Sequence, residues 1–276
     1  MFESQTRTRV SDIVAAPGLK RERERTGKGD KVKKPRIGIY GSVPKGLCEN
    51  EVITSILGYD PFDGQEVDQD GIIAPYSGRA HKFGIHYTIY DLFTPTSIEE
   101  VVDVVKQAIT GIKAFNYAFP GFSGYVRGDY QGRSVYDEGS KTVIGLDFDE
   151  TGKTELKKMH KAILQAIQKC RTGIEPEFDK EIFRNEPALW DLIREYGAPY
   201  VLENYSPHLT LASGLDGSDE TVSRLIDYLN AEYGSKLLDR EIPFTSVYVF
   251  QEIVEGKFEG YFRVCEEIRI DDRDQQ

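Results

Sequence analysis

Two of the four histidines in the chain are each followed, two positions later, by a threonine. The pairs are His86 with Thr88 and His208 with Thr210, and each lies in a short alternating run that predicts a β-strand. Because residues i and i+2 of a strand point to the same face, each strand presents an imidazole and a hydroxyl together. If the two strands pack around a pseudo-twofold axis, two imidazoles and two hydroxyls meet in one groove.

These side chains suit displacement at the phosphorus of a phosphoester. One neutral imidazole can take a proton from the attacking water or hydroxyl, while the other, protonated, gives a proton to the leaving oxygen. We therefore expect His86 and His208 to be catalytic, and the sequence does not tell which is the acid. Thr88 and Thr210 are expected to donate to the non-bridging phosphate oxygens. The chemistry needs no metal, and we expect neither a metal site nor a cofactor.

The other two histidines lack this setting. A single His-x-Thr is common by chance and would favour a structural histidine, but its repetition with apolar flanks favours a functional pair. His81 is expected to lie along the approach to the first strand. His160 lies in a Lys-rich helical segment and is expected at the surface.

A polar turn and an amphipathic helix follow each of the two strands. Ser97 and Glu100 form a capping box before the first helix, and Ser218 and Asp219 offer caps for the second. The first apolar stripe comprises Ile98, Val101, Val102, Val105 and Ile109, and the second comprises Val222, Leu225, Ile226 and Leu229. Two copies of one supersecondary unit is the simplest interpretation.

The rest of the chain supplies the elements around these two units. Residues 44–78 are rich in Gly, Asp and Pro and are expected to be loops. The other expected elements are strands at Arg36–Val43, Thr142–Phe148, Phe244–Phe250 and Tyr261–Ile270, and helices at Glu155–Cys170 and from Pro187 to about Tyr196. We predict an α+β fold of two pseudo-symmetric lobes, each a small antiparallel sheet backed by helices, with a central groove.

The first 36 residues differ in composition from the rest. Between Lys20 and Arg36, nine basic residues accompany three acidic ones with almost no apolar residue, which predicts a basic flexible tail. The tail is either a solvated arm or an arm that makes weak contact with RNA. We place one bilobal domain at residues 37–276, with lobe boundaries near residues 140 and 200.

Charge and cysteine content exclude several classes of protein. The net charge of −11 argues against a general binder of duplex nucleic acid, whose affinity comes from neutralised phosphates. The three cysteines have no Cys-x-x-Cys spacing, so neither a disulfide framework nor a zinc site is indicated. There is no apolar N-terminal stretch of signal length and no run of eighteen apolar residues. We expect a soluble cytoplasmic protein without membrane partners, and a monomer is compatible with the sequence.

At its two His-x-Thr strands the chain resembles the two-histidine phosphoesterase superfamily, which includes RNA 2′,3′-cyclic phosphodiesterases and the so-called 2′–5′ RNA ligases. The resemblance follows the order of elements from about Arg36 to Ile270. It implies catalysis by His86 and His208 and phosphate binding by Thr88 and Thr210. The implied substrate is a small phosphoester: a cyclic nucleotide, an RNA end or a sugar phosphate, cut at a cyclic phosphodiester or a 2′–5′-type linkage.

Two further segments are similar to a bacterial branch encoded with phosphonate-degradation enzymes. Lys82-Phe83-Gly84-Ile85-His86-Tyr87-Thr88 resembles its Tyr-Gly-Phe-His-Ala-Thr run. Gly197-Ala198-Pro199-Tyr200-Val201 resembles its Gly-Tyr-Pro-Tyr-Val, which also precedes the second motif. The basic tail and the loop-rich stretch before Gly78 depart from that branch.

Two alternative functions compete with this one. The apolar strand that ends in Asp147-Phe148-Asp149-Glu150-Thr151 matches the Asp-x-Asp-x-Thr signature of magnesium-dependent haloacid-dehalogenase-type phosphatases. Against it, no convincing alternation of strands and helices follows the motif. The other alternative is a non-catalytic module that binds RNA or cyclic nucleotides. There an aromatic segment would stack a base and hold a phosphate, through Tyr117, Phe119, Phe122, Tyr125 and Arg127.

Overall fold

A computed structural model describes residues 34–127, 129–130, 133–134, 141–215 and 219–270. The chain divides into two units, residues 1–32 and 33–276, and the first lies outside the described residues. The predicted basic tail at residues 1–36 therefore falls almost wholly outside them. All the described helices and strands belong to the second unit.

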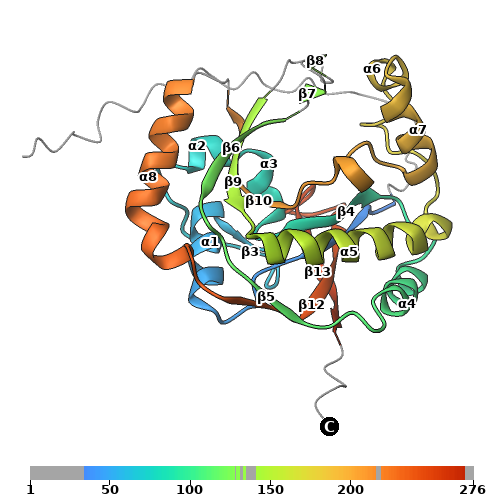
Figure 1. Cartoon of the computed structure of the whole chain (residues 1–276), viewed down its shortest axis with the longest axis horizontal. Helices are drawn as coiled ribbons and strands as arrows, with labels where there is room; N and C mark the ends of the chain where they lie inside the picture. The colour runs from blue at the N-terminus through green and yellow to red at the C-terminus, as the bar shows by residue number, and fades with distance from the viewer. Residues whose placement is uncertain (1–33, 128, 131–132, 135–140, 216–218, 271–276) are drawn as a thin grey trace, which may run out of the picture. The chain divides into compact units, whose positions relative to one another are not determined.

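Seven strands form the main sheet of this unit, in the order β13-β12-β1-β4-β10-β9-β6 (Figure 1). Every pairing within this sheet is antiparallel. The strands are β1 (Ile37–Gly41), β4 (Tyr87–Phe93), β6 (Phe122–Arg127), β9 (Lys141–Asp147), β10 (His208–Leu215), β12 (Ser246–Glu252) and β13 (Phe262–Arg269).

The helices and the short strand pairs connect and cover this sheet. The longer helices are α1 (Cys48–Leu57), α4 (Ile98–Ala108), α5 (Glu150–Ile167), α7 (Pro187–Tyr196) and α8 (Asp219–Leu237). The short helices are α2 (Ala74–Ser77), α3 (Arg79–Phe83) and α6 (Glu181–Arg184), with 3₁₀ turns at Gln168–Cys170 and Leu202–Asn204. The two-stranded ladders are β2 (Tyr59–Asp60) with β3 (Gln65–Glu66), β5 (Phe115–Tyr117) with β11 (Ile242–Phe244), and β7 (Asp129–Tyr130) with β8 (Arg133–Ser134).

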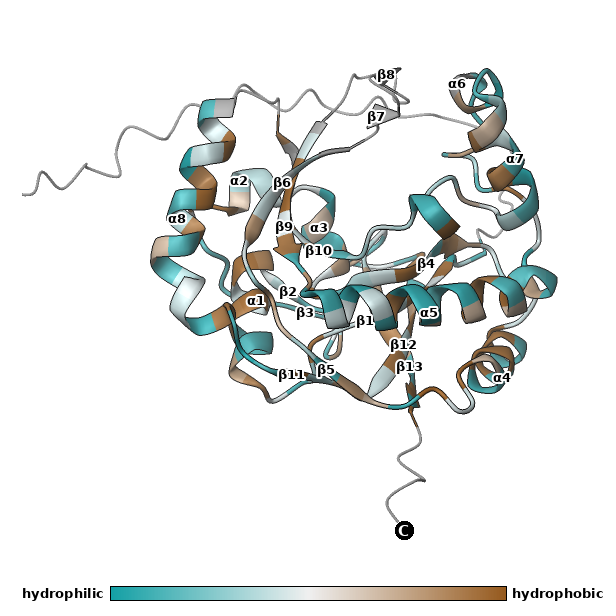
Figure 2. Cartoon of the chain, in the orientation of Figure 1, coloured by the Kyte–Doolittle hydropathy of each residue, from teal (hydrophilic) through white to brown (hydrophobic). Residues whose placement is uncertain are grey.

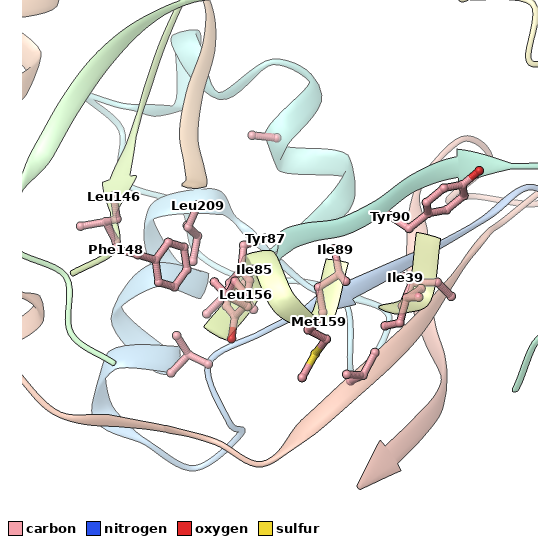
Figure 3. Packing of buried hydrophobic residues seen from close by; sticks show 14 of the residues in the cluster. Ile39, Ile85, Tyr87, Ile89, Tyr90, Leu146, Phe148, Leu156, Met159 and Leu209 are labelled. Atoms are coloured by element: carbon pink, nitrogen blue, oxygen red, sulfur yellow. The ribbon is translucent and has the colours of Figure 1, made fainter. Parts of the chain in front are cut away.

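The core lies between one face of the main sheet and the helices that cover it. Helix α5 packs against β4, α4 packs against α5, and α8 packs against β6 and β9. Figure 3 shows Leu156 and Met159 of α5 beside Tyr87, Ile89 and Leu209 of the sheet. All five side chains are fully buried. The helices are amphipathic, as the mixture of teal and brown along α4, α5 and α8 shows in Figure 2.

The predicted α+β class with antiparallel strands is confirmed, but the sheet differs from the expected pair of small sheets. The structure has one continuous main sheet. Its two middle strands, β4 and β10, are joined through a single residue pair, Tyr87 with Leu209. The narrow junction divides the sheet into β13-β12-β1-β4 and β10-β9-β6, each carrying one His-x-Thr pair.

Local capping explains where the predicted helices begin. Ser97 accepts a hydrogen bond from the Glu100 backbone N–H at 3.0 Å, as the capping box predicts. The helix expected at Glu155–Cys170 starts earlier, at Glu150. The reason is that Asp149 caps it by accepting from the Gly152 N–H at 2.8 Å. The predicted caps of α8 at residues 218 and 219 lie outside the described side chains.

Two expectations about individual segments were wrong. Residues 44–78 contain helix α1, which buries polar Glu49, Asn50 and Thr54 beside its apolar residues and therefore shows no clean apolar stripe. His160 is 2% exposed rather than at the surface, because α5 turns this face toward β4 and the segment before β10. Among the described helices, none is both long and apolar enough to cross a membrane.

Candidate active site

The two His-x-Thr pairs meet at the junction between β4 and β10. Tyr87 and Leu209 are paired there, and both side chains are fully buried and directed into the core. Their sequence neighbours on the two strands must point to the opposite face of the sheet. The residues on that face are His86, Thr88, His208 and Thr210, all of them half-buried. We call the surface that they form the junction face.

Both imidazoles are held in the same way by the backbone. The Nδ1–H of His86 donates to the carbonyl oxygen of Gly84 at 2.9 Å, and the Nδ1–H of His208 donates to that of Ser206 at 2.9 Å. A carbonyl oxygen can only accept, so Nδ1 carries the proton in each ring. Nε2 is therefore the nitrogen on which each histidine gains or loses a proton.

Gly84 makes this geometry possible on the β4 side. It has a φ of +65°, in the region where residues with a side chain are strained. A Cβ there would lie 2.5 Å from Pro61 and 2.7 Å from the carbonyl oxygen of Tyr59. The glycine thus allows the turn that presents its carbonyl to His86.

His86 lies among aromatic rings. Phe83 stacks on it with ring centroids 4.9 Å apart, Tyr40 meets it edge-on at 5.0 Å, and Phe250 lies 6.2 Å away. Burial lowers the pKa of His86 to about 4, and the nearby positive charges of His208 and Arg79 act in the same direction. The hydrogen bond to Gly84 opposes this shift only in part. The ring is therefore neutral at neutral pH.

His208 has a different neighbourhood, built from polar groups of β9 and β6. Asp147 is its direct cross-strand partner on the same face, and the ring of Tyr125 lies 5.0 Å from the imidazole. The hydroxyls of Ser123 and Tyr125 each donate to a different oxygen of the Asp147 carboxylate. Burial first, and then the hydrogen bond to Asp147, raise the pKa of Tyr125. The two histidines thus share a backbone arrangement but not an environment.

A glycine also allows the Asp147 cluster to form. Gly145 lies on β9 opposite Thr210 and Ser123. A Cβ at this position would lie 2.6 Å from the carbonyl oxygen of Leu209 and 3.4 Å from the Tyr125 ring. The bare backbone therefore lets β10 approach closely and leaves room for the ring of Tyr125.

An open pocket of about 380 Å³ borders Phe83, the residue that stacks on His86. Arg79 and Lys82 line it together with Phe262, which stacks on Phe83 at 4.0 Å. Arg36, Glu177 and Glu252 also line the pocket, where Arg36 is bound to both carboxylates and Arg79 lies 3.8 Å from Glu177. The pocket therefore carries charges of both signs.

The other predicted site residues have different outcomes. Tyr125 lies beside His208 on the junction face, whereas the side chain of Arg127 lies outside the described residues. Tyr117 and Phe119 are buried in the core, so they are not available to stack a base. Sequence reasoning missed two rings around His86: Tyr40, which the pairing of β1 with β4 brings there, and Phe83, which lies only three residues before His86 at the end of α3.

The acidic pair Asp147 and Asp149 does not form the site expected of a haloacid-dehalogenase-type phosphatase. Asp149 is the N-cap of α5, and β9 is antiparallel to both of its neighbours. Within the described ranges, no three His, Cys, Asp or Glu residues are grouped so that they could hold a metal ion. Asp147 belongs instead to the surroundings of His208. Gly145 and Asp147 are two positions apart on a predicted strand. This spacing indicates that both residues lie on the same face of the sheet.

Comparisons with known proteins identify a family model and several structures. Residues 144–259 match the model described as "Protein of unknown function (DUF1045)". This range contains His208, Thr210 and Asp147 but not His86. No curated protein matches the chain.

The chain is similar to solved structures across most of its length. Usb1 of Kluyveromyces marxianus shares 11% identity over 86% of this chain and 98% of that chain, with a TM-score of 0.38. A crystal structure of a phosphoesterase shares 8% identity over 87% and 100%, with a TM-score of 0.39. Usb1 of the same organism with uridine monophosphate shares 9% identity over 86% and 98%, with a TM-score of 0.36. The phosphonate-associated branch stays a prediction.

Proposed function

We propose that the protein is a metal-independent phosphoesterase in which His86 and His208 transfer the protons. The observation that carries this proposal is the pairing of Tyr87 with Leu209, which turns both His-x-Thr pairs onto one face. Because both rings carry their Nδ1 proton toward a backbone carbonyl, the two Nε2 atoms are the matched donor and acceptor.

The reaction is displacement at a phosphodiester. A water molecule attacks phosphorus and gives a proton to one Nε2, while the bond from phosphorus to the leaving oxygen breaks. The other histidine gives its Nε2 proton to that oxygen, so the product is a phosphomonoester with a new hydroxyl. The hydroxyls of Thr88 and Thr210 donate to the non-bridging oxygens, which carry the charge during displacement.

The substrate we propose is a cyclic phosphodiester or a 2′–5′-type linkage in a nucleotide, an RNA end or a sugar phosphate. Arg79 acts electrostatically on His86, and both Arg79 and Lys82 line the adjacent pocket. Arg79 is also 3.8 Å from Glu177, so Lys82 is the cation that we propose to attract an anionic substrate, although the whole chain has a net charge of −11. The proposal concerns a small ligand and not a nucleic-acid duplex.

The test is hydrolysis by the full chain in the presence of excess chelator. The substrates are 2′,3′-cyclic nucleotides, cyclic dinucleotides, 2′–5′ oligoadenylates and cyclic ribose phosphates. Hydrolysis of at least one substrate is expected. Hydrolysis that requires added magnesium, or binding without turnover, would contradict the proposal.

Substitution of either histidine tests the roles of the two rings. His86→Ala and His208→Ala should each lower kcat at least about a hundredfold, the usual contribution of a positioned acid or base. His81→Gln is the matched control, because His81 bonds to Leu57 and Tyr261 away from the junction face. Circular dichroism should show an intact fold in all three variants. Wild-type turnover in either alanine variant would remove the proposal.

A further inference from the structure

The two histidines that share the junction face are surrounded by opposite chemistry. Around His86 lie the rings of Phe83, Tyr40 and Phe250, and the nearest charges are positive. Beside His208 lies a carboxylate, Asp147, directly across from it in the ladder. A reaction that needs one acid and one base can use this difference to decide which ring does which.

We propose that Asp147 holds His208 in its protonated form and so makes it the general acid, which leaves His86 as the general base. The inference rests on the proposed function and assigns roles that the symmetry of the two motifs leaves open. Asp147 does not touch the reacting atoms in this proposal. It is a positioning residue that acts through His208.

Two hydrogen bonds fix the position of the Asp147 carboxyl group. Ser123 donates to one of its oxygens and Tyr125 to the other. Directly opposed residues of an antiparallel pair have Cβ atoms about 4.5–5.5 Å apart and point to the same face. A carboxylate within about 4–6 Å of an imidazole favours its protonated form.

No comparable negative group acts on His86 among the described residues. The groups that face it are Tyr40 on β1, Phe250 on β12, Phe83 and Arg79 on α3, and His208 on β10. Glu252, on the same strand as Phe250, is bound to Arg36. Burial lowers the pKa of His86 to about 4, which agrees with a ring that stays neutral until it receives the proton of the attacking water.

The described groups that face His208 include Asp147 on β9, Tyr125 on β6 and His86 on β4, while helix α3, which carries Arg79, packs against β10. Because burial raises the pKa of Tyr125, its phenol stays protonated and continues to donate to Asp147. The neutral phenol orders the carboxylate without adding charge. Asp147 is thus held in place beside His208.

With these roles, both protons that move in the reaction can be followed. Water attacks phosphorus, and its proton passes to Nε2 of His86. The bond between phosphorus and the leaving oxygen breaks, and Nε2 of His208 gives its proton to that oxygen. After product release, His86 loses one proton to solvent and His208 gains one, which restores the starting state.

The first test measures the protonation of the histidines directly. With four histidines in the chain, each imidazole can be followed by NMR as the pH is varied, with His208→Gln and His86→Gln for assignment. We expect His208 to titrate at higher pH than His86, and Asp147→Asn to lower the His208 midpoint by about one unit. The His86 midpoint should move much less.

Two control variants separate the charge of Asp147 from general disturbance of the cluster. Asp149→Asn makes the same chemical change two residues away, in a helix cap where asparagine serves equally well. Ser123→Ala removes a hydrogen bond to Asp147 but keeps its charge. Neither should lower the His208 midpoint. If Asp147→Asn leaves that midpoint unchanged, or if Ser123→Ala lowers it as much, the inference fails.

The second test uses a leaving group that needs no proton. On a p-nitrophenyl phosphodiester, Asp147→Asn and His208→Ala should lose little turnover, whereas His86→Ala should lose at least about a hundredfold. On a cyclic nucleotide all three variants should be slow, and Asp147→Asn should shift the basic limb of the pH profile to lower pH. Equal losses on both substrates would overturn the assignment. If no substrate is hydrolysed, the proposed function fails, while the NMR titration still decides whether Asp147 controls His208.

Discussion

Each histidine of the junction face is defined by a short segment of backbone and by the rings or charges beside it. The carbonyls of Gly84 and Ser206, each two residues before its histidine, fix the proton on Nδ1. Gly84 leaves room for Tyr59 and Pro61 beside the turn before His86, and Gly145 lets β10 approach β9 closely. At this scale, small residues and carbonyl groups determine what the imidazoles can do.

The stacked ring of Phe83 gives a residue-scale prediction about pH. The low pKa of His86, about 4, should place the acidic limb of kcat/KM near that pH, because the base works only when neutral. Phe83→Ala exposes the imidazole, favours its protonated form and should move this limb upward toward the ordinary histidine value of 6.5. The measurement is kcat/KM between about pH 3.5 and 8.

Phe258→Ala provides the control for this experiment. Phe258 lies beside Tyr59 and Tyr261, so its loss should leave the acidic limb in place. An acidic limb near 6.5 in the unsubstituted chain would show that burial of His86 is not what sets its protonation.

At the scale of elements, His160 joins three segments that position the two motifs. Its Nδ1–H donates to the carbonyl of Ile89 on β4 at 2.6 Å, and its Nε2 accepts from the backbone N–H of Leu202 at 3.1 Å. The imidazole stacks on Tyr205 at 3.9 Å, and the Tyr205 hydroxyl donates to the carbonyl of Thr88 at 2.7 Å. Helix α5 thereby ties β4 to the segment that leads into His208.

This arrangement requires a neutral His160, because one nitrogen donates and the other accepts. His160→Phe leaves two buried backbone groups without partners, and we expect it to lower the free energy of unfolding by about 2–4 kcal/mol. Urea denaturation measures the change. Lys161→Ala, an exposed neighbour on the same helix, should change stability by less than about 0.5 kcal/mol.

The same residue predicts how stability depends on pH. Burial lowers the pKa of His160 in the folded chain below the 6.5 of an ordinary histidine. Its contribution is therefore fully present above about pH 6.5 and is lost as the pH falls below that value. His160→Phe should weaken this acid sensitivity, and an unchanged profile would contradict the role given to the imidazole.

At the scale of the whole described unit, one ion-pair cluster joins segments far apart in the sequence. Arg36 precedes β1 and bonds to Glu252 of β12 at 2.9 Å and to Glu177 at 3.0 Å. Glu252 is 4% exposed, and both of its carboxylate oxygens accept a hydrogen bond from Arg36. The cluster fixes the start of β1 between β12 and the segment before α6.

Replacing Arg36 alone should destabilise the fold more than replacing Arg36 and Glu252 together. Arg36→Met removes the guanidinium that is bound to the buried carboxylate of Glu252, and we expect the free energy of unfolding in urea to fall by about 3–5 kcal/mol. The double variant Arg36→Met with Glu252→Gln should recover a large part of this loss. Equal stabilities of the single and double variants would show that the buried charge is not the cause.

The sequence by itself determined the local elements. The His-x-Thr strands, the Ser97 capping box and a helix from Pro187 to Tyr196 follow from period, caps and turn residues, which act between near neighbours. Only the tertiary structure decided that Tyr87 meets Leu209, that His160 is buried and that Asp147 faces His208. The first and third outcomes depend on the register between strands more than fifty residues apart in the chain, and the burial of His160 depends on how α5 packs against β4. Register is fixed by the packing of a shared core, and no local pattern records it.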